Sequence, residues 1–279
     1  MFPIRSARQI GPDLTRLDVE APDLARASLP GQFLILRIDE RGERIPLTIA
    51  DADPDAGTVT IIFLAVGKTT RQLSRLREGE GILDVAGPLG RHMEIERVGT
   101  VACVGGGVGV PALYPKAKAL KQAGNRVVSI LGARTEELLV LVDEMGLISD
   151  EVRFTTDDGS RGRKGFVSDE LGAMLEEPAT RPDLVVAVGP IPMMASVAKT
   201  TRPHDVKTLV SLNPIMVDGT GMCGGCRVTV GGETKFACVD GPVFDAHEVD
   251  FEELAKRQQR FTDFERRAKE AFDHVCRLR

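Results

Sequence analysis

The 279-residue chain has no tryptophan, a single tyrosine and four histidines, and no apolar run approaches the ~20 residues of a membrane-spanning helix. Its formal net charge of −5 argues against a protein that binds nucleic acid through a basic surface. The N-terminal segment holds no apolar stretch of signal-peptide length. We therefore expect a cytoplasmic protein that has no membrane span and binds no nucleic acid.

Glycine, in contrast, is abundant, with 29 residues, which suggests backbone that approaches ligands closely. The five cysteines are an odd number, which argues for metal or redox chemistry rather than a disulfide framework. Cys223, Cys226 and Cys238 lie close together in the sequence, whereas Cys103 and Cys276 stand alone.

Residues 1–96 are typical of a β-domain, because short β-rich segments alternate with turn clusters. One helix is expected at Thr70–Arg77, capped by Thr69 and Thr70, and a turn is expected at Gly87–Gly90. The spacing predicts a barrel or a sandwich. The expected strands are Pro3–Gln9, Leu14–Val19, Gln32–Ile38, Pro46–Ala50 and Thr58–Ala65.

Residues 97–212 alternate strands with helices, which predicts a doubly wound parallel sheet. The expected strands are Val101–Val104, Val127–Leu131, Val152–Thr155, Leu184–Val188 and Lys207–Leu212. The expected helices are Val110–Lys121, Glu136–Met145, Phe166–Leu175 and Pro192–Thr200.

Residues 213–279 form a third unit, in which a glycine-rich, cysteine-bearing segment precedes a charged helical tail that begins near Asp250. An apolar stripe on this tail is compatible with packing on its own domain or with a partner. The stripe consists of Phe251, Leu254, Phe261, Phe264 and Phe272.

A glycine-rich turn directly follows the first strand of the α/β region and opens a helix. Bare backbone and the helix N-terminus together favour a pyrophosphate at this place, although glycines also serve tight turns without a ligand. The turn consists of Gly105, Gly106, Gly107, Val108 and Gly109. A second turn, Gly189-Pro190 before Met193, ends another buried strand at the edge where open α/β sheets bind ligands.

A further group lies in the β-domain, where an arginine precedes one strand and a glycine opens the helix. Together they can hold a diphosphate. Each feature alone is better explained as a surface arginine or a helix cap, but ahead of a nucleotide domain the pair favours a second dinucleotide. The residues are Arg44, Pro46, Leu47, Thr48, Gly67, Thr69 and Thr70.

The clustered cysteines follow Asp218 in the pattern D-x4-C-x2-C-x11-C. Plant-type ferredoxins hold a [2Fe–2S] cluster with C-x4-C-x2-C…C, so Asp218 stands at the first ligand position. Zinc sites also use C-x2-C, but they usually add a second such pair or histidines. We rank a cluster held by Asp218, Cys223, Cys226 and Cys238 above zinc. Asp218-Gly219 is also a common turn dipeptide, which leaves a turn aspartate as the alternative.

In this order the motifs resemble the ferredoxin-reductase superfamily over nearly the whole chain. The motifs R-x-P-L-T at 44–48, G-K-x-T at 67–70 and G-P-L-G at 87–90 are similar to its FAD barrel. The turns at 105–111 and 189–193 are similar to its NAD(P) domain. The cluster segment resembles the dihydroorotate dehydrogenase type B electron transfer subunit, in which four cysteines hold the cluster. Aspartate in first place is similar to the small subunit of the NADH-dependent reduced ferredoxin:NADP oxidoreductase.

The resemblance implies an FAD-binding β-barrel at 1–96, an NAD-binding α/β domain at 97–212, and a [2Fe–2S] domain with a helical tail at 213–279. Arg44 would neutralise the FAD diphosphate, which the residues at 67–70 would cover, while those at 46–48 would line the flavin. The run 105–109 would hold the NAD pyrophosphate. The nicotinamide side would be bordered by Asp157, Asp158, Gly189, Pro190 and Met193.

The implied activity is hydride transfer between NAD(H) and FAD, followed by one-electron relay through the cluster, with no catalytic side chain. The implied partner is a larger flavin and iron–sulfur subunit that handles ferredoxin and NADP(H), in a heterodimer that bifurcates electrons. Arg134, after the second strand of the α/β domain, leaves NAD and NADP both open. The alternatives are the dihydroorotate dehydrogenase subunit and a zinc-stabilised nucleotide-binding protein without activity.

Overall fold

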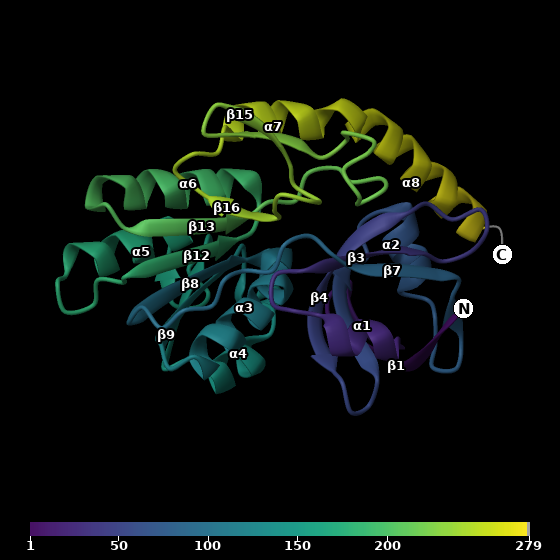
Figure 1. Cartoon of the computed structure of the whole chain (residues 1–279), viewed down its shortest axis with the longest axis horizontal. Coiled ribbons are helices and arrows are strands. Elements are labelled where there is room, and N and C mark those ends of the chain that lie inside the picture. The colour runs from purple at the N-terminus through teal and green to yellow at the C-terminus, as the bar shows by residue number, and fades with distance from the viewer. Residues whose placement is uncertain (278–279) are drawn as a thin grey trace.

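The computed structural model describes residues 1–277, without the side chains of Lys269 and of residues 271–277. A β-barrel lies beside an α/β domain, and a smaller C-terminal unit ends in a long helix that arches over both (Figure 1). No helix within residues 1–277 is long and apolar enough to cross a membrane.

The barrel is a seven-stranded antiparallel sheet in the order β6-β1-β2-β5-β4-β3-β7. Its two edge strands follow one another almost directly in the chain, so the sheet curls until its edges meet. Alternate residues such as Leu17, Val19, Val59 and Ile61 are buried and form its core. The elements are β1 (Phe2–Gly11), β2 (Leu14–Glu20), α1 (Pro22–Ala27), β3 (Phe33–Arg37), β4 (Ile45–Asp53), β5 (Thr58–Leu64), α2 (Lys68–Leu73), β6 (Gly81–Ile82) and β7 (Asp84–Leu89).

The α/β domain contains the predicted doubly wound sheet, in the order β11-β10-β9-β8-β12-β13-β16, with every strand parallel except β16. The chain order reverses between β8 and β12, which makes the gap between these two strands the switch point of the sheet. The elements are β8 (Thr100–Gly106), η1 (Gly107–Gly109), α3 (Val110–Gln122), β9 (Arg126–Ala133), η2 (Glu136–Leu138), α4 (Val142–Ile148), β10 (Glu151–Thr156), β11 (Arg163–Lys164), α5 (Val167–Glu176), β12 (Leu184–Val188), α6 (Ile191–Thr201), η3 (Arg202–His204) and β13 (Lys207–Ser211).

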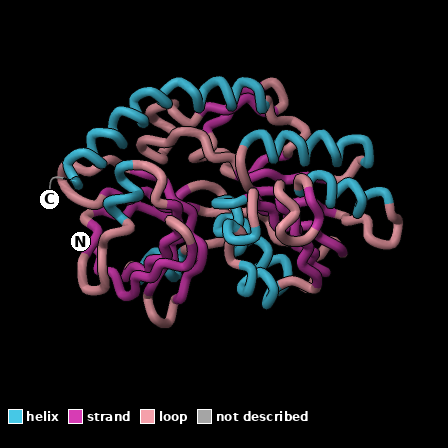
Figure 2. Tube along the Cα trace, turned by 180° about the vertical axis from the view of Figure 1, so that it is seen from behind, coloured by secondary structure: helices cyan, strands magenta, loops and turns pink. Residues whose placement is uncertain are grey.

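Helices cover both faces of this sheet (Figure 2). On β8, Val101 and Cys103 belong to the core beneath α3, whereas Ala102 and Val104 belong to the core beneath α5 and α6. All four residues are fully buried, which explains why the strand reads as a continuous apolar run in the sequence.

The C-terminal unit joins the α/β sheet through β16, which pairs antiparallel with β13. Its core is continuous with that of α5 and α6, and it reaches Phe33 and Ile35 on the barrel. The expected boundaries at 96/97 and 212/213 fall between β7 and β8 and between β13 and β14. Its elements are β14 (Arg227–Val230), β15 (Glu233–Phe236), β16 (Val243–Asp245), α7 (Phe251–Gln258), η4 (Gln259–Phe261) and α8 (Thr262–Arg277).

Three local predictions were wrong. The segment expected as a turn at Gly87–Gly90 lies mostly in β7, an edge strand that tolerates Pro88 because it pairs only with β3. The helix expected at Glu136–Met145 is divided into η2 and α4, since Leu141 has a φ of 52°. The helix expected at Thr70–Arg77 is α2, which begins at Lys68, and α1 is a second helix in the barrel.

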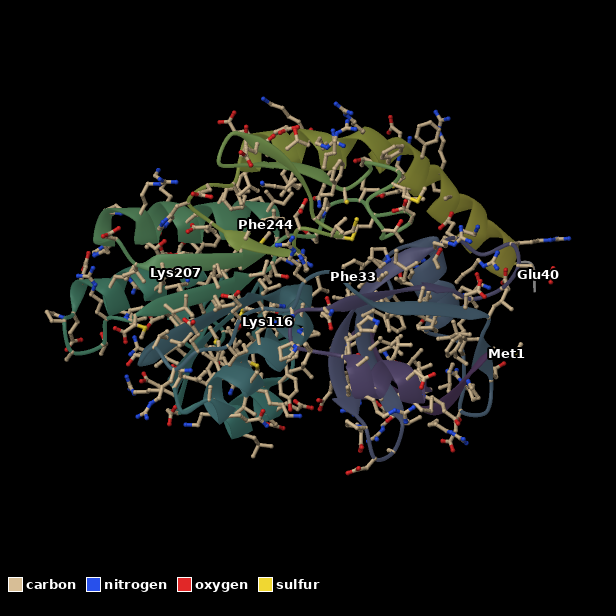
Figure 3. The ribbon with its side chains drawn as sticks, in the orientation of Figure 1. Met1, Phe33, Glu40, Lys116, Lys207 and Phe244 are labelled. Atoms are coloured by element: carbon tan, nitrogen blue, oxygen red, sulfur yellow. The ribbon has the colours of Figure 1, made fainter. Side chains whose placement is uncertain are left out.

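Lys116 is fully buried on α3, on the side of the domain that faces the barrel (Figure 3). Its Nζ donates a hydrogen bond of 2.7 Å to the carbonyl of Ala112. Burial lowers the pKa of Lys116 from 10.5 to about 8. Between these values the unfolded chain binds more protons than the folded protein, so this residue makes stability rise with pH across that window.

We expect Lys116→Met to raise the free energy of unfolding at neutral pH by roughly 1–3 kcal/mol, because it removes a buried charge. The gain should shrink as the pH rises from about 8 to 10.5. Urea unfolding across that range measures it. Lys118→Met is the control, since Lys118 is half-exposed and pairs with Asp51 at 2.9 Å, and it should give no such gain. If Lys116→Met raised the free energy of unfolding by the same amount at every pH, the lowered pKa of Lys116 would be contradicted.

Candidate functional site

A cavity of about 810 Å³ lies where the barrel, the α/β domain and the C-terminal unit meet. Strand β4 contributes Pro46, Leu47 and Thr48, the residues expected at the flavin. The loops after β8 and β12 and the C-terminal tail complete the wall, so the cavity brings the expected flavin residues together with the glycine turns of the α/β domain. Phe33 on β3 and Asn213 after β13 also line the cavity. The loops and the tail contribute Val108, Gly109, Gly189, Pro190, Ala255, Gln258, Gln259, Thr262 and Glu265.

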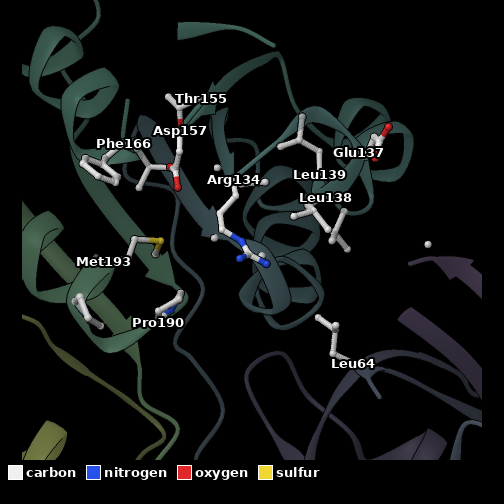
Figure 4. A pocket seen from close by; sticks show the side chains of 18 of the residues that line it. Leu64, Arg134, Glu137, Leu138, Leu139, Thr155, Asp157, Phe166, Pro190 and Met193 are labelled. Atoms are coloured by element: carbon white, nitrogen blue, oxygen red, sulfur yellow. The ribbon is translucent and has the colours of Figure 1, made fainter. Parts of the chain in front are cut away.

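A second cavity, of about 620 Å³, lies between the β1–β2 turn of the barrel and the α/β domain. Arg134 extends into it from the end of β9 (Figure 4). Pro190 lines both cavities, so the two adjoin at the loop after β12. Of the residues expected to bind the dinucleotide, this cavity is lined by Gly106, Gly107, Asp157, Pro190 and Met193.

Asp158 does not line either of these cavities. Its Oδ1 accepts hydrogen bonds from the backbone N–H of Ser160 at 3.0 Å and from the Ser160 hydroxyl at 2.7 Å. These bonds lower the pKa of Asp158, so the carboxylate stabilises the turn after β10. Asp157 is the member of this pair that faces the cavity.

The glycines of the first turn serve two different purposes. A Cβ on Gly106 would lie 2.4 Å from Sδ of Met193, and one on Gly109 would lie 2.1 Å from the carbonyl oxygen of Val188. Gly109 is needed for packing because its neighbour is backbone, whereas a side chain on Gly106 would displace the flexible end of Met193 and one on Gly105 would press on the Val110 side chain. Gly107 differs, because no atom lies within 4 Å of the place of its Cβ and its φ is +50°. Gly107 is therefore the glycine whose bare backbone faces open space.

The start of α2 holds the other predicted diphosphate residues, outside the larger cavity. The Thr70 hydroxyl accepts the backbone N–H of Gly67 at 3.0 Å and thereby caps the helix. The Thr69 hydroxyl donates to Glu43 at 2.6 Å. Glu43, an acidic side chain at the place expected for a phosphate, was not predicted from the sequence. Arg44 lies next to it in the chain, with an exposed side chain.

The cluster segment brings its predicted ligands together in two pairs. The sulfur atoms of Cys226 and Cys238 are 3.1 Å apart and buried. Asp218 and Cys223 lie on the exposed side of the loop, where Asp218 Oδ2 accepts the backbone N–H of Cys223 at 2.9 Å. Asp218 Oδ1 accepts the backbone N–H of Thr220 at 3.0 Å, and these bonds lower the pKa of Asp218. Asp218 therefore has the turn geometry of the alternative interpretation.

The surroundings of the sulfurs fit a [2Fe–2S] cluster. The N–H of Gly225 points to the Cys223 sulfur and that of Cys238 to the Cys226 sulfur, each at 3.4 Å, as amides do around cluster thiolates. Burial raises the pKa of Cys238 to about 12, so binding of iron must release protons here. Such a cluster places two protein ligands on each iron.

A zinc ion would need four ligands around one centre. Among the residues with described side chains, no three of the types His, Cys, Asp and Glu are grouped to hold a single ion. Cys103 is buried under α3, as expected for a packed thiol, and burial raises its pKa to about 12. Cys276 lies outside the described side chains.

The apolar stripe of the tail packs on the core only at its start, where Phe251 lies against the core and Leu254 belongs to it. Leu254 is buried, but Phe261 and Phe264 are 48% and 68% exposed, and Phe272 lies outside the described side chains. The side of the tail toward the larger cavity carries Gln258, Thr262 and Glu265 instead. These polar residues of the tail were not predicted to line a cavity. Helical periodicity identifies the apolar face of a helix, and it does not indicate that the polar face contacts a cavity.

The glycine turn provides a test that separates binding from folding. Gly107→Ala should raise the KM for the nicotinamide dinucleotide at least tenfold, because the methyl group projects into open space that a pyrophosphate would fill. The strain at positive φ should cost only about 1 kcal/mol of stability. Gly109→Ala should instead lower Tm steeply or prevent folding. Steady-state kinetics and thermal unfolding measure both variants, and equal effects on Tm would contradict this division.

A family model for the iron–sulfur cluster binding domain of dihydroorotate dehydrogenase B matches residues 213–250. The chain is 50% identical over 264 residues to a dihydroorotate dehydrogenase B (NAD(+)) electron transfer subunit homolog of Thermotoga maritima, covering 95% of this chain and 93% of that protein. It is 35% identical over 251 residues to the dihydroorotate dehydrogenase B (NAD(+)) electron transfer subunit of Shouchella clausii, covering 86% and 94%.

A solved structure of the NADH-dependent reduced ferredoxin-NADP oxidoreductase, from work on flavin-based electron bifurcation, matches with a TM-score of 0.92 and 48% identity over 98% of both chains. Phthalate dioxygenase reductase, at 17% identity and a TM-score of 0.58, shares the fold. The expected superfamily and its three-part architecture are confirmed. The chain thus belongs to the family of the dihydroorotate dehydrogenase B electron transfer subunits and their homologues.

Proposed function

We propose that this chain is the FAD- and [2Fe–2S]-carrying subunit of an NAD(H)-dependent ferredoxin:NADP oxidoreductase. The observation that carries the proposal is the cavity of about 810 Å³, whose wall is shared by the barrel, the switch-point loops and the C-terminal unit. A flavin held there would lie between the loops after β8 and β12 and residues of the C-terminal unit. The match to the ferredoxin-NADP oxidoreductase structure over 98% of both chains supports the same function.

When bound, FAD and NAD(H) supply hydride transfer and the [2Fe–2S] cluster supplies one-electron transfer. The chain positions them. Leu47 and Thr48 of the larger cavity would line the flavin, and Gly107 of the smaller cavity would give the dinucleotide a close approach to the N-terminal end of α3. Arg44, exposed just before β4, would hold the diphosphate.

The cluster unit lies close to the flavin because of its own glycines. Gly219 has a φ of +74°, and a Cβ on it would lie 2.6 Å from Cδ1 of Ile35 on β3. This contact presses the loop that carries Asp218 and Cys223 onto the barrel. Cys223 and Met222 are exposed on the same loop, so the cluster side of the molecule is open to a redox partner. We infer that this partner is a larger subunit of a heterodimer, through which ferredoxin and NADP(H) react in an electron-bifurcating complex. The cytoplasmic location stays a prediction.

The names of the relatives favour a second candidate, the electron transfer subunit of an NAD-dependent dihydroorotate dehydrogenase B. The two candidates share the cofactors and differ in the partner and in the first cluster ligand, which is aspartate here. Purification of the native complex separates them, because the larger subunit will oxidise either dihydroorotate or reduced ferredoxin.

Anaerobic addition of NADH to the purified chain tests the core of the proposal. It should bleach the flavin absorbance and then produce the EPR signal of a reduced [2Fe–2S] cluster. A colourless protein that contains zinc, or a flavin that NADH does not reduce, would contradict it.

Substitution of Asp218 tests the ligand set in the same assay. Asp218→Cys should keep the iron content but shift the EPR g-values, because thiolate replaces a harder oxygen donor. Asp218→Asn keeps an oxygen that can accept the Thr220 N–H but loses the anionic ligand, so its iron content should fall. Asp240→Asn is the control, since Asp240 accepts the backbone N–H of Phe236 at 2.7 Å in the same unit. Wild-type iron and EPR in both Asp218 variants would assign Asp218 to the turn alone.

A further inference from the structure

The C-terminal tail connects the three parts of the site. At its start, Arg257 on α7 donates a hydrogen bond of 3.3 Å to the carbonyl of Gly225 in the cluster loop. One residue later, Gln258 donates to the carbonyl of Asn213 at 2.7 Å, at the edge of the larger cavity. Helix α8 then runs to the barrel and packs against α2, as Figure 1 shows. The tail therefore crosses over the cavity rather than leaving the molecule.

One face of the tail forms part of the cavity wall. Its members recur at intervals of three or four residues, as the exposed or buried side of a single helix does. They are Ala255, Gln258, Gln259, Thr262 and Glu265. Phe261 and Phe264 do not line the cavity, and both are exposed to solvent. Gln259, Thr262 and Glu265 are also exposed, but they line the cavity that holds the expected flavin residues Leu47 and Thr48.

Glu265 is distinctive within this wall. Among the described residues that line the cavity it is the one with an ionisable side chain. Its acidic neighbours on α8 are engaged elsewhere, because Asp263 and Glu270 pair with Arg266 at 3.8 Å and 3.1 Å. Glu265 makes no hydrogen bond or ion pair with any residue that the structure describes. Within the part of the chain whose side chains are described, its carboxylate is thus a single negative charge at the cavity without a counter-ion.

We propose that Glu265 sets the redox potential of the flavin, an inference that rests on the proposed function. A hydride brings two electrons and one proton, so a flavin that accepts it gains one net negative charge. A carboxylate facing that flavin opposes the gain, and no other ionisable side chain among the described residues lines the cavity to offset it. The charge of Glu265 therefore lowers the midpoint potential of the flavin, and the reduced flavin is a stronger reductant toward the cluster.

The test measures the flavin midpoint potential in the FAD-loaded full chain by spectroelectrochemical titration. Glu265→Gln keeps the shape and the helix propensity of the side chain, so it should fold normally. It should shift the equilibrium toward reduced flavin by about tenfold, which is about 30 mV for a two-electron couple. Glu265→Asp restores the charge and should stay within about twofold of the wild type.

Asp263→Asn is the matched control, because it removes one acid from the same turn of α8 but does not face the cavity. If Glu265→Gln shifts the potential no more than Asp263→Asn does, the proposal is overturned. That failure differs from failure of the proposed function. If the wild-type chain does not bind FAD, or if Arg44→Ala retains all of its FAD, the flavin site itself is wrongly assigned, whatever Glu265 does.

Discussion

The close packing of the loop after β8 against the loop after β12 is the constraint on which the rest of the site depends. Gly109 is so near the Val188 backbone that a single added carbon on the glycine would overlap the valine carbonyl. Gly106 lies against the Met193 sulfur in the same way, but that side chain can move. This contact lies at the switch point of the sheet, where β8 pairs with β12, and Pro190 and Pro192 just after β12 line both cavities. The sites proposed for the dinucleotide and the flavin are adjacent for this reason.

The parts of the fold that sequence alone could predict are those in which local pattern and tertiary structure agree. The buried strands of the α/β domain are continuous apolar runs, and the glycine turns follow two of them, so both the sheet and its ligand edge could be inferred. Gly87–Gly90 shows where this agreement ends. Its composition is that of a turn, but closing the barrel requires a last strand, and pairing with β3 prevails over the local preference.

The individual site residues divide in the same way. Residue types such as glycine and cysteine have few other reasons to occur in such spacing, so their clusters could be found. Glu43 and Asp158 could not be assigned from the sequence, because their positions follow from which hydroxyl or amide each carboxylate reaches in three dimensions. Asp218 combines both cases. Its spacing matches a cluster ligand, yet its two oxygens accept backbone N–H groups as a turn aspartate does.

The phenylalanines of the C-terminal tail show that an apolar stripe does not always identify the buried side of a helix. A stripe of phenylalanines on a charged helix normally marks the side that packs inward, because burial of apolar area drives helix docking. Here Phe261 and Phe264 face outward, and the polar side faces a cavity that the protein does not fill with its own side chains. The start of the stripe, with Phe251 and Leu254, does pack on the core, so the two halves of the tail differ. The periodicity left packing on the chain's own domain and contact with a partner both open, and it could not show that residues of the polar side line a cavity.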